Sequence, residues 1–549
     1  MQRVWPVLLA GVSGVLLALA FPKVDWNILA WVAFIPLLWL TQGQTLRRAF
    51  GLGWLAGMGF YLCTLYWIVD TIGLYSNIPH IIAVGPLLLA CTILSAYTGV
   101  FAAGLSVYHQ SGPHSSGWSL LVFGPMLWVA LEWVRSFFFI GFPWVSLGYS
   151  QYNFLNLIQF VEYTGVYGLS ALVIFGNIVL FLAFSRPGRG RLLLVLLLII
   201  TGLWGWGNWR RSQLAALPTA HTLNVGIAQG NIAQDQKWDP DYQELTLARY
   251  EQLTRQITQQ TVDLVIWPEA AVPFFFQSDV TYRGRLLDLA QDTKTPILFG
   301  SPAFRTDKTD LTLFNRAYLL SPDTTILGHY DKMILTPFGE YIPFQDSVLF
   351  FLDKFVEGIG DFAPGTTPTV FSLPLKRQRD LHADDEAGDD DSFETFGVLI
   401  CYEGVFPDLA RRFVHNGARL LINVTNDAWF GETSAPYQHQ AMEAMRAVEN
   451  RVPLVRSANT GISAIVNIDG QIQAQTALLE TTFIADQLAW PHVTSFYTRY
   501  GDWFVTLCVA GTLVMLSYAG ITVLFIKRTG GGGDARGNRR KTTRSERTY

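Results

Sequence analysis

The sequence predicts two structural units, a bundle of membrane-spanning α-helices and a soluble α/β domain. Three observations lead to this prediction. Up to about Trp209 the 549-residue chain is almost entirely apolar, with charged residues only in short gaps. From about His221 to Gln487 the composition is the mixed one of a soluble protein, and one more apolar run and a basic tail follow. The averages of 50% hydrophobic and 15% charged residues, with a mean hydropathy of +0.27, conceal this division.

Apolar runs near the length of a membrane span occur about eight times. A helix needs roughly 18 or more apolar residues to cross a bilayer, and the second and seventh runs are shorter. Arg3 and the segment Ala18–Ala20 resemble the ends of a signal peptide, but the next apolar run follows so closely that we expect an uncleaved span. The predicted spans are Val4–Phe21, Asn27–Leu40, Ala49–Ile68, His80–Val107, Trp118–Val134, Val161–Phe184, Leu192–Trp206 and Trp503–Ile526.

The Lys and Arg residues of the short loops predict the orientation of the bundle. Lys and Arg are enriched in cytoplasmic loops, and most of them fall on one side if eight spans alternate. The soluble domain is then on the opposite face, although Arg210 and Arg211 run against this trend. We interpret the basic tail as a topology anchor rather than a nucleic-acid-binding segment. The residues on the predicted cytoplasmic side are Arg3, Arg47, Arg48, Arg186, Arg189, Arg191 and those of the C-terminal tail.

Four units follow from these patterns. They are a transmembrane bundle of about seven spans (1–212), a soluble domain (213–490), a last span (491–528) and a basic cytoplasmic tail (529–549). Within the soluble domain, the acidic segment 376–394 is predicted to be a disordered loop, because it has nothing to bury. Its Asp residues lack the fixed spacing of a metal-binding loop. The chain has no G-x-G-x-x-G, P-loop, H-E-x-x-H or paired C-x-x-C motif, so neither a cofactor nor a metal is predicted.

The soluble domain alternates strand-like and helical segments, which predicts a sheet flanked by helices. Short apolar runs bounded by turn residues predict the strands, and helical spacing with few breakers predicts the helices. The segment Arg456–Gly470 is predicted to form two short strands or a hairpin. The expected strands are Leu223–Ile232, Val262–Glu269, Pro296–Phe304, Phe396–Glu403 and Ala418–Asp427, and the expected helices are Gln243–Gln259 and His439–Asn450.

Cys401 is the only cysteine of the soluble domain. The other three, Cys63, Cys91 and Cys508, fall in predicted spans, where a cysteine serves as a small apolar filler. Cys401 therefore has no partner for a disulfide within its domain. It ends the apolar run Val398–Ile400, which leaves two interpretations, a buried filler or a nucleophile.

Two more polar residues occupy comparable places. Glu269 ends the apolar strand of "VIWPEAAVPFF", and Lys332 lies in the apolar neighbourhood of "YDKMILTPFGEYIPF". Strand ends meet at one edge of a sheet, so the three side chains are expected to converge. A carboxylate beside a thiol can take its proton, the thiolate is then the nucleophile, and an ammonium can stabilise an oxyanion. Taken alone, each of these three residues is more often an ordinary surface or core residue than a catalytic one.

These segments resemble the motifs of a known superfamily. "WPEAAVP", "DKMILTPFGEYIPF" and "LICYEGVFPD" are similar to the Glu, Lys and Cys motifs of the nitrilase superfamily, and "NVTNDAWFG" resembles the segment after its cysteine strand. The resemblance implies an α-β-β-α sandwich for the soluble domain. It also implies a catalytic triad of Glu269, Lys332 and Cys401.

A narrower resemblance extends over most of the chain, from about Val4 to Ile526. "EWVRSFFFIGFPWVSLGYSQ", "GVYGLS", "QGNIAQDQKWDP", "PFGEYIPF" and "AMRAVENRVPLVRSANTGISAI" are similar to segments of apolipoprotein N-acyltransferases, a membrane-bound branch of that superfamily. The resemblance implies transfer of an acyl chain from a membrane phospholipid, through a cysteine thioester, to the N-terminal amine of diacylglyceryl-modified apolipoproteins. It implies the bacterial inner membrane, with the catalytic domain on the periplasmic side, and no cofactor or nucleic-acid partner.

The same resemblance implies roles for Trp238, Glu340, Tyr402 and Glu403. Glu340 and Glu403 would support the lysine or orient the base, and Trp238 would shape the acyl entrance. The alternatives are packing alone for Glu340, Glu403 and Tyr402, and a loop anchor for Trp238.

Other interpretations stay open at this point. The runner-up function is a membrane-tethered amidase or nitrile-type C–N hydrolase that uses the same triad with water as the acceptor. A transporter or a sensor is a different class; no internal repeat is evident, and a sensor would have no need of the triad. Glu132 and Arg135, near the end of a span, form either a buried ion pair or interfacial anchors, and we interpret them as snorkelling residues. The apolar loops Ala271–Phe276 and Val348–Leu352 either enter the lipid or pack in the core.

Overall fold

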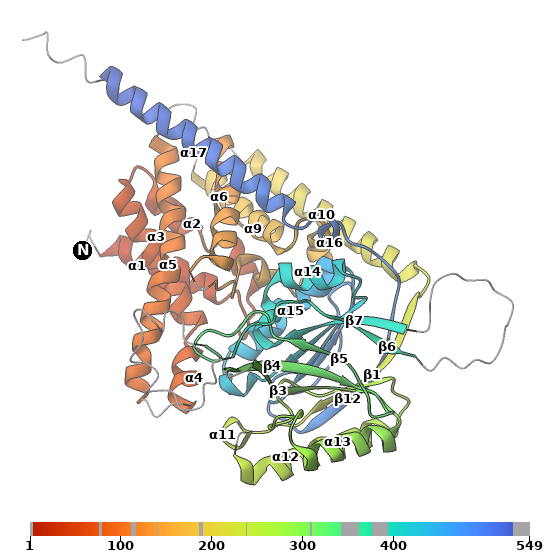
Figure 1. Cartoon of the computed structure of the whole chain (residues 1–549). Helices are drawn as coiled ribbons and strands as arrows, with labels where there is room; N and C mark the ends of the chain where they lie inside the picture. Colours follow the sequence, from red (N-terminus) through yellow and green to blue (C-terminus); the bar gives the residue numbers. More distant parts are fainter. Residues whose placement is uncertain are drawn as a thin grey trace, which may run out of the picture.

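The computed structural model describes residues 4–75, 79–110, 117–139, 141–185, 190–237, 239–307, 310–341, 362–375 and 393–530. The chain forms a helical bundle and an α/β sandwich that lie against each other (Figure 1). The last long helix returns from the sandwich to the bundle and runs along it. The acidic segment 376–394 falls almost entirely outside the described residues, as do Trp238 and the loop Val348–Leu352.

The described part of the bundle contains five helices that are long and apolar enough to cross a membrane. A bent pair, α3 (Leu46–Thr64) and α4 (Trp67–Tyr75), would make a sixth span with a break of 51°. The first two predicted spans form shorter helices, so the count of about eight spans is not confirmed. The five long helices are α5 (His80–Gln110), α6 (Gly117–Phe137), α9 (Val166–Ser185), α10 (Arg191–Ala216) and α17 (Trp503–Gly530), and the shorter ones are α1 (Trp5–Ala18), η1 (Asn27–Trp31) and α2 (Ile35–Thr41).

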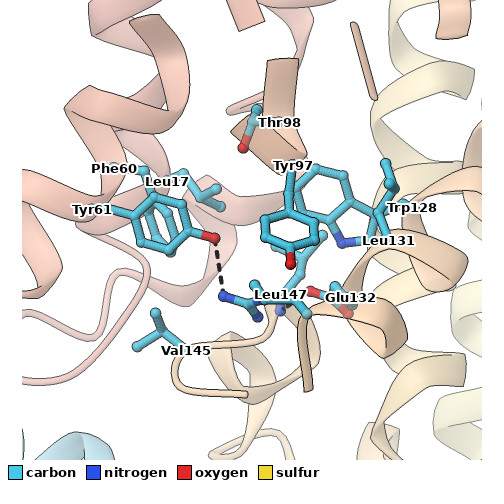
Figure 2. A pocket seen from close by; sticks show the side chains of 11 residues that line it. Leu17, Phe60, Tyr61, Tyr97, Thr98, Trp128, Leu131, Glu132, Val145 and Leu147 are labelled. Atoms are coloured by element: carbon cyan, nitrogen blue, oxygen red, sulfur yellow. Dashed lines mark hydrogen bonds between the residues drawn. The ribbon is translucent and has the colours of Figure 1, made fainter. Parts of the chain in front are cut away.

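Glu132 and Arg135 do not snorkel at the span end, because their side chains are only 4% and 3% exposed. Arg135 donates hydrogen bonds to the Tyr61 hydroxyl (2.9 Å) and to the carbonyl oxygen of Trp144 (3.0 Å). A carboxylate oxygen of Glu132 accepts from the backbone N–H of Leu147 (2.6 Å). Tyr61 and Glu132 face a cavity of about 20 Å³ (Figure 2). The two charged residues therefore fix the loop after α6 from inside the bundle.

The soluble domain is a sandwich of two six-stranded sheets. The first sheet has the order β12-β1-β2-β3-β4-β5 and the second β11-β10-β9-β8-β7-β6. Helices α12 (Pro240–Ile257) and α13 (Val280–Thr293) cover the first sheet, and α14 (Pro407–His415) and α15 (Ala435–Asn450) cover the second (Figure 1). This is the expected α-β-β-α arrangement. The strands are β1 (His221–Gln229), β2 (Leu264–Ile266), β3 (Ile297–Asp307), β4 (Asp310–Leu320), β5 (Ile326–Asp331), β6 (Val370–Pro374), β7 (Phe393–Ile400), β8 (Leu420–Thr425), β9 (Leu454–Ala458), β10 (Ala464–Val466), β11 (Ile472–Gln475) and β12 (Thr482–Trp490).

The central strands are buried on both faces, which explains their continuous apolar sequences. Strands β1, β2 and β3 are parallel in one sheet, and β7, β8 and β9 are parallel in the other. The backbone N–H that follows β8 bonds to Glu269, which follows β2, so the carboxyl ends of β2, β7 and β8 lie at one edge of the sandwich. The predicted hairpin is confirmed as the antiparallel pair β9 and β10. In the loop Ala271–Phe276, core packing is confirmed for Phe274 and Phe276, which are 7% and 2% exposed.

Helix α15 joins the sandwich to the bundle, and all its residues except Tyr437 are buried. Arg446 donates to the hydroxyl of Tyr149 (2.8 Å), and Arg451 forms an ion pair with Glu162 (2.7 Å). Trp144, in the loop fixed by Arg135, donates through its indole N–H to Gln438 (2.8 Å). These contacts hold the second sheet and its strand ends against the membrane half.

Candidate active site

Cys401 lies at the sharp turn between β7 and the short helix η4 (Cys401–Val405). Its φ is +52°, a left-handed conformation that a non-glycine residue rarely adopts. Its carbonyl oxygen is 3.2 Å from the side-chain amide nitrogen of Asn423 and 3.3 Å from Nε2 of His439. Such strain persists where the surroundings hold it in place, typically at functional sites. The turn presents the thiol at the edge where the strands end.

Glu269 and Lys332 meet at the same edge. Glu269 follows β2 and Lys332 follows β5, and the Lys332 ammonium lies 3.3 Å from Oε1 of Glu269. The other carboxylate oxygen of Glu269 accepts from the backbone N–H of Asn426 (2.9 Å), just after β8. Both residues act electrostatically on the Cys401 thiol. The structure thus brings the three predicted residues into one cluster.

Glu340 belongs to this cluster too. Its Oε2 lies 2.8 Å from the Lys332 ammonium and accepts from the backbone N–H of Thr336 (2.7 Å). The side-chain amide of Asn315 donates to both Glu269 (2.8 Å) and Glu340 (2.6 Å). Asn315 lies on the long strand β4 and bridges the two carboxylates. Glu340 therefore contacts the lysine, as the resemblance implies.

Glu403 and Tyr402 form hydrogen bonds with the backbone, with Tyr330 and with the bundle. One Glu403 oxygen accepts from the Tyr330 hydroxyl (2.8 Å) and from the N–H groups of Met333 (2.7 Å) and Ile334 (3.0 Å). The other accepts from the N–H of Ile400 (2.8 Å), so Glu403 ties the cysteine turn to the lysine loop. The Tyr402 hydroxyl donates to the carbonyl of Gly141 (3.1 Å), in the loop after α6.

The charges of the cluster suit proton transfer from thiol to carboxylate. Burial raises the pKa of the Cys401 thiol, and the Glu269 carboxylate raises it further, whereas Lys332 opposes them. Burial also acts to raise the pKa of Glu269, but Lys332 and Lys237 hold that pKa below its usual value. Burial would lower the pKa of Lys332, yet Glu340 and Glu269 keep it above its usual range. At rest the site therefore holds a thiol, a carboxylate and an ammonium, and the thiol must lose its proton as it attacks.

Several residues of the site were not singled out from the sequence. Lys237, Asn426, Asp427 and Arg456 all lie in segments that carried the resemblance, but nothing in their spacing indicated which side chains converge. Behind Cys401, Arg456 bonds to Asp427 (2.5 Å) and Glu443, and His439 contacts Asp427 (3.1 Å). In the part of the chain that the structure describes, no three His, Cys, Asp or Glu side chains are placed to hold a metal ion.

We predict that Glu403→Gln destabilises the protein. Glu403 is fully buried and accepts four hydrogen bonds. A glutamine offers one acceptor oxygen, so its NH₂ group would meet a backbone or hydroxyl donor, and a buried donor without a partner costs about 1–3 kcal/mol. Thermal unfolding in detergent measures the loss, with the exposed Glu432→Gln as the matched control. Equal melting temperatures for the two variants would contradict this role.

Comparisons with known proteins agree with this architecture. Residues 13–179 match the apolipoprotein N-acyltransferase N-terminal domain family, and residues 224–489 match the carbon-nitrogen hydrolase family. An apolipoprotein N-acyltransferase of Geobacter metallireducens is 42% identical over 522 residues, which cover 93% of this chain and 95% of the relative. Relatives of the same name from Photobacterium profundum and Brucella suis are 30% and 31% identical, over 90% and 93% of this chain and 92% and 94% of their own lengths.

Among solved structures, an amidase from Nesterenkonia sp. aligns with 53% of this chain and 98% of its own, at 18% identity and a TM-score of 0.36. That likeness is too slight to bear on function. The sequence relatives match both halves of the chain and nearly its whole length. The chain therefore belongs to the apolipoprotein N-acyltransferase family.

Proposed function

We propose that this chain moves an acyl chain from a membrane phospholipid, through a thioester on Cys401, to the N-terminal amine of diacylglyceryl-cysteine on apolipoproteins. The observation that carries the proposal is the cluster, at the sandwich edge, of the buried Glu269 carboxylate and Lys332 ammonium with the half-buried Cys401 thiol. The next residue, Tyr402, bonds to the loop after α6 in the helical bundle. The names of the relatives support an apolipoprotein as the acceptor. The apolar helices support a location in the membrane.

In the first half-reaction, Glu269 takes the proton of the Cys401 thiol as the sulfur attacks the ester carbonyl of the phospholipid. The negative charge that develops on the carbonyl oxygen is stabilised by the Lys332 ammonium. The carbon–oxygen bond of the ester breaks, and the leaving glycerol oxygen receives the proton from Glu269. A lysophospholipid departs, and the acyl chain stays on Cys401 as a thioester.

In the second half-reaction, the amine of the apolipoprotein attacks the thioester carbonyl and Lys332 again faces the oxyanion. The carbon–sulfur bond breaks, and Glu269 accepts the proton of the amine and passes it to the leaving Cys401 sulfur, which restores the thiol and the carboxylate. An ester becomes a thioester and then an amide, which is the most stable of the three. The two transfer steps therefore need no nucleotide to drive them.

The position of the site supports a substrate that stays in the bilayer. Tyr402, next to the nucleophile, bonds to Gly141 beyond the end of α6, and α15 packs against the bundle. If α1 and α2 are counted with the longer helices, eight spans place the sandwich opposite the Lys- and Arg-rich loops. We infer that the protein lies in the bacterial inner membrane with its catalytic domain on the periplasmic side.

The test is the intact mass of the detergent-purified protein after incubation with phospholipid and no acceptor amine. We expect a mass increase of one acyl chain that hydroxylamine removes. Cys401→Ala should show no increase, whereas Cys63→Ala, a matched control in α3, should be acylated like the wild type.

A folded wild-type protein that gains no mass would rule out phospholipid as the acyl donor. The amidase interpretation, with the same triad and water as the acceptor, would then take its place. An adduct that persists in Cys401→Ala would show that another residue carries the acyl chain.

A further inference from the structure

The buried charges around Glu269 are unbalanced within the predicted site. The Lys332 ammonium contacts two carboxylates, Glu269 at 3.3 Å and Glu340 at 2.8 Å. The three residues are only 1%, 7% and 8% exposed, respectively. One cation and two anions leave a negative charge shielded from water, which favours protonation of a carboxylate. A base that must stay ionised needs another cation nearby.

Lys237 is in the position to supply that cation. It ends the short helix α11 (Gln234–Lys237) and is 3% exposed. Its ammonium donates a hydrogen bond to the backbone carbonyl of Glu269 (2.9 Å). The next residue, Ala270, has a φ of +45°, so this bond fixes the main chain at a strained turn. Burial lowers the pKa of Lys237 to about 8, which leaves it mostly protonated at pH 7.

We propose that Lys237 is a positioning residue of the active site, whose ammonium keeps Glu269 ionised and whose hydrogen bond holds the turn that presents it. The proposal rests on the proposed function to the extent that Glu269 serves as the base for Cys401. It adds a second buried lysine to the three residues that the resemblance implies.

The other groups that face this site do not replace Lys237. Asn315 and the N–H of Asn426 donate to Glu269 but carry no charge. Asp427 also acts on Cys401, but it has cationic partners of its own in Arg456 and His439. Glu403 lies within electrostatic reach of Lys332, and burial raises its pKa to about 7. Of these groups, none offers Glu269 a second positive charge.

The test measures how the alkylation of Cys401 by iodoacetamide depends on pH, in the full-length protein in detergent. Peptide mass spectrometry distinguishes Cys401 from the other three cysteines. Alkylation needs the thiol proton to leave but needs no lipid, so it reports on Glu269 whether or not phospholipid is the donor. In the wild type the lowest acidic step of the rate should lie below pH 4.5, because the pKa of Glu269 is held below that value; ionisation of the Cys401 thiol adds a separate step at higher pH.

Lys237→Gln keeps a hydrogen-bond donor for the Glu269 carbonyl and removes the charge. We expect the acidic fall in the rate to move up by about 1–3 pH units, the usual effect of losing a close opposite charge. Lys237→Arg keeps both properties and should behave as the wild type does. Lys294→Gln, at an exposed lysine, is the matched control.

An unchanged pH profile in Lys237→Gln, even with a slower rate at every pH, would overturn the proposal and leave Lys237 a purely structural role. If neither variant folds, the wild type still decides, because a profile whose lowest acidic step lies above pH 4.5 contradicts an ionised Glu269. A missing acyl adduct in the mass experiment would instead refute the proposed function and leave the alkylation result intact.

Discussion

Replacing Glu269 with glutamine should slow the acylation of Cys401 by about 100- to 10,000-fold, the usual contribution of a general base. Glutamine has almost the same volume but cannot accept the thiol proton. Burial and the neighbouring carboxylate raise the pKa of Cys401, so few molecules carry a thiolate without this base. The rate of mass increase with phospholipid, with no acceptor present, measures the effect.

The exposed Glu480→Gln is the matched control and should react at the wild-type rate. The pH profile adds a second check. Lys332 and Lys237 hold the pKa of Glu269 below its usual value, so the wild-type rate is retained above that pKa and is lost as the pH falls through it. Glu269→Gln should lack this fall. A loss of less than tenfold, or an unchanged acidic fall, would exclude Glu269 as the base.

Lys332→Met should have two separate effects. The ammonium that faces the oxyanion is lost, and removal of one such group typically costs about 100- to 1,000-fold in rate. The variant also leaves Glu269 and Glu340 without their shared cation, and breaking a buried ion pair costs about 3–5 kcal/mol. The acylation rate and the melting temperature in detergent measure the two effects independently.

A second substitution separates these effects. Adding Glu340→Gln to Lys332→Met removes one of the two uncompensated carboxylates, so the melting temperature should recover in part while the rate stays low. Lys294→Met, on the surface, is the control for the lysine substitution. If the rate recovered along with the melting temperature, Lys332 would act through stability alone and the oxyanion role would be wrong.

The buried central strands of the sandwich were largely predictable, and its outer strands were not. The buried strands β1, β3, β7 and β8 follow continuous apolar runs, a local property that the sequence displays directly. Strands β4, β5, β6, β11 and β12 were not predicted. Strands β5 and β11 are partly exposed, and their sequences lack a continuous apolar run. Their place in the sheets depends on pairing with distant strands, which local composition does not reveal.

The helices of the bundle were also predicted only in part. Hydropathy located each apolar segment, but the structure has five long helices and a bent pair where about eight spans were expected. Hydropathy averages over a run and does not detect the 51° break between α3 and α4 or the early end of α1 at Ala18. It also placed Glu132 and Arg135 at the interface, although they bond to the loop Trp144–Leu147 from inside the bundle.

The sequence by itself determined the division into a membrane half and an α/β half, the family resemblance, and the three residues expected to perform the chemistry. Each of these features depends on residues that are close in the sequence, either in an apolar run or in a motif at a strand end. Only the tertiary structure decided which charges neutralise one another. Asn315 bridges Glu269 and Glu340, and Lys237 bonds to Glu269 across 32 positions of the chain. Burial and ion pairing depend on segments that meet only after folding, because the electrostatic energy of a group is set by its neighbours in space.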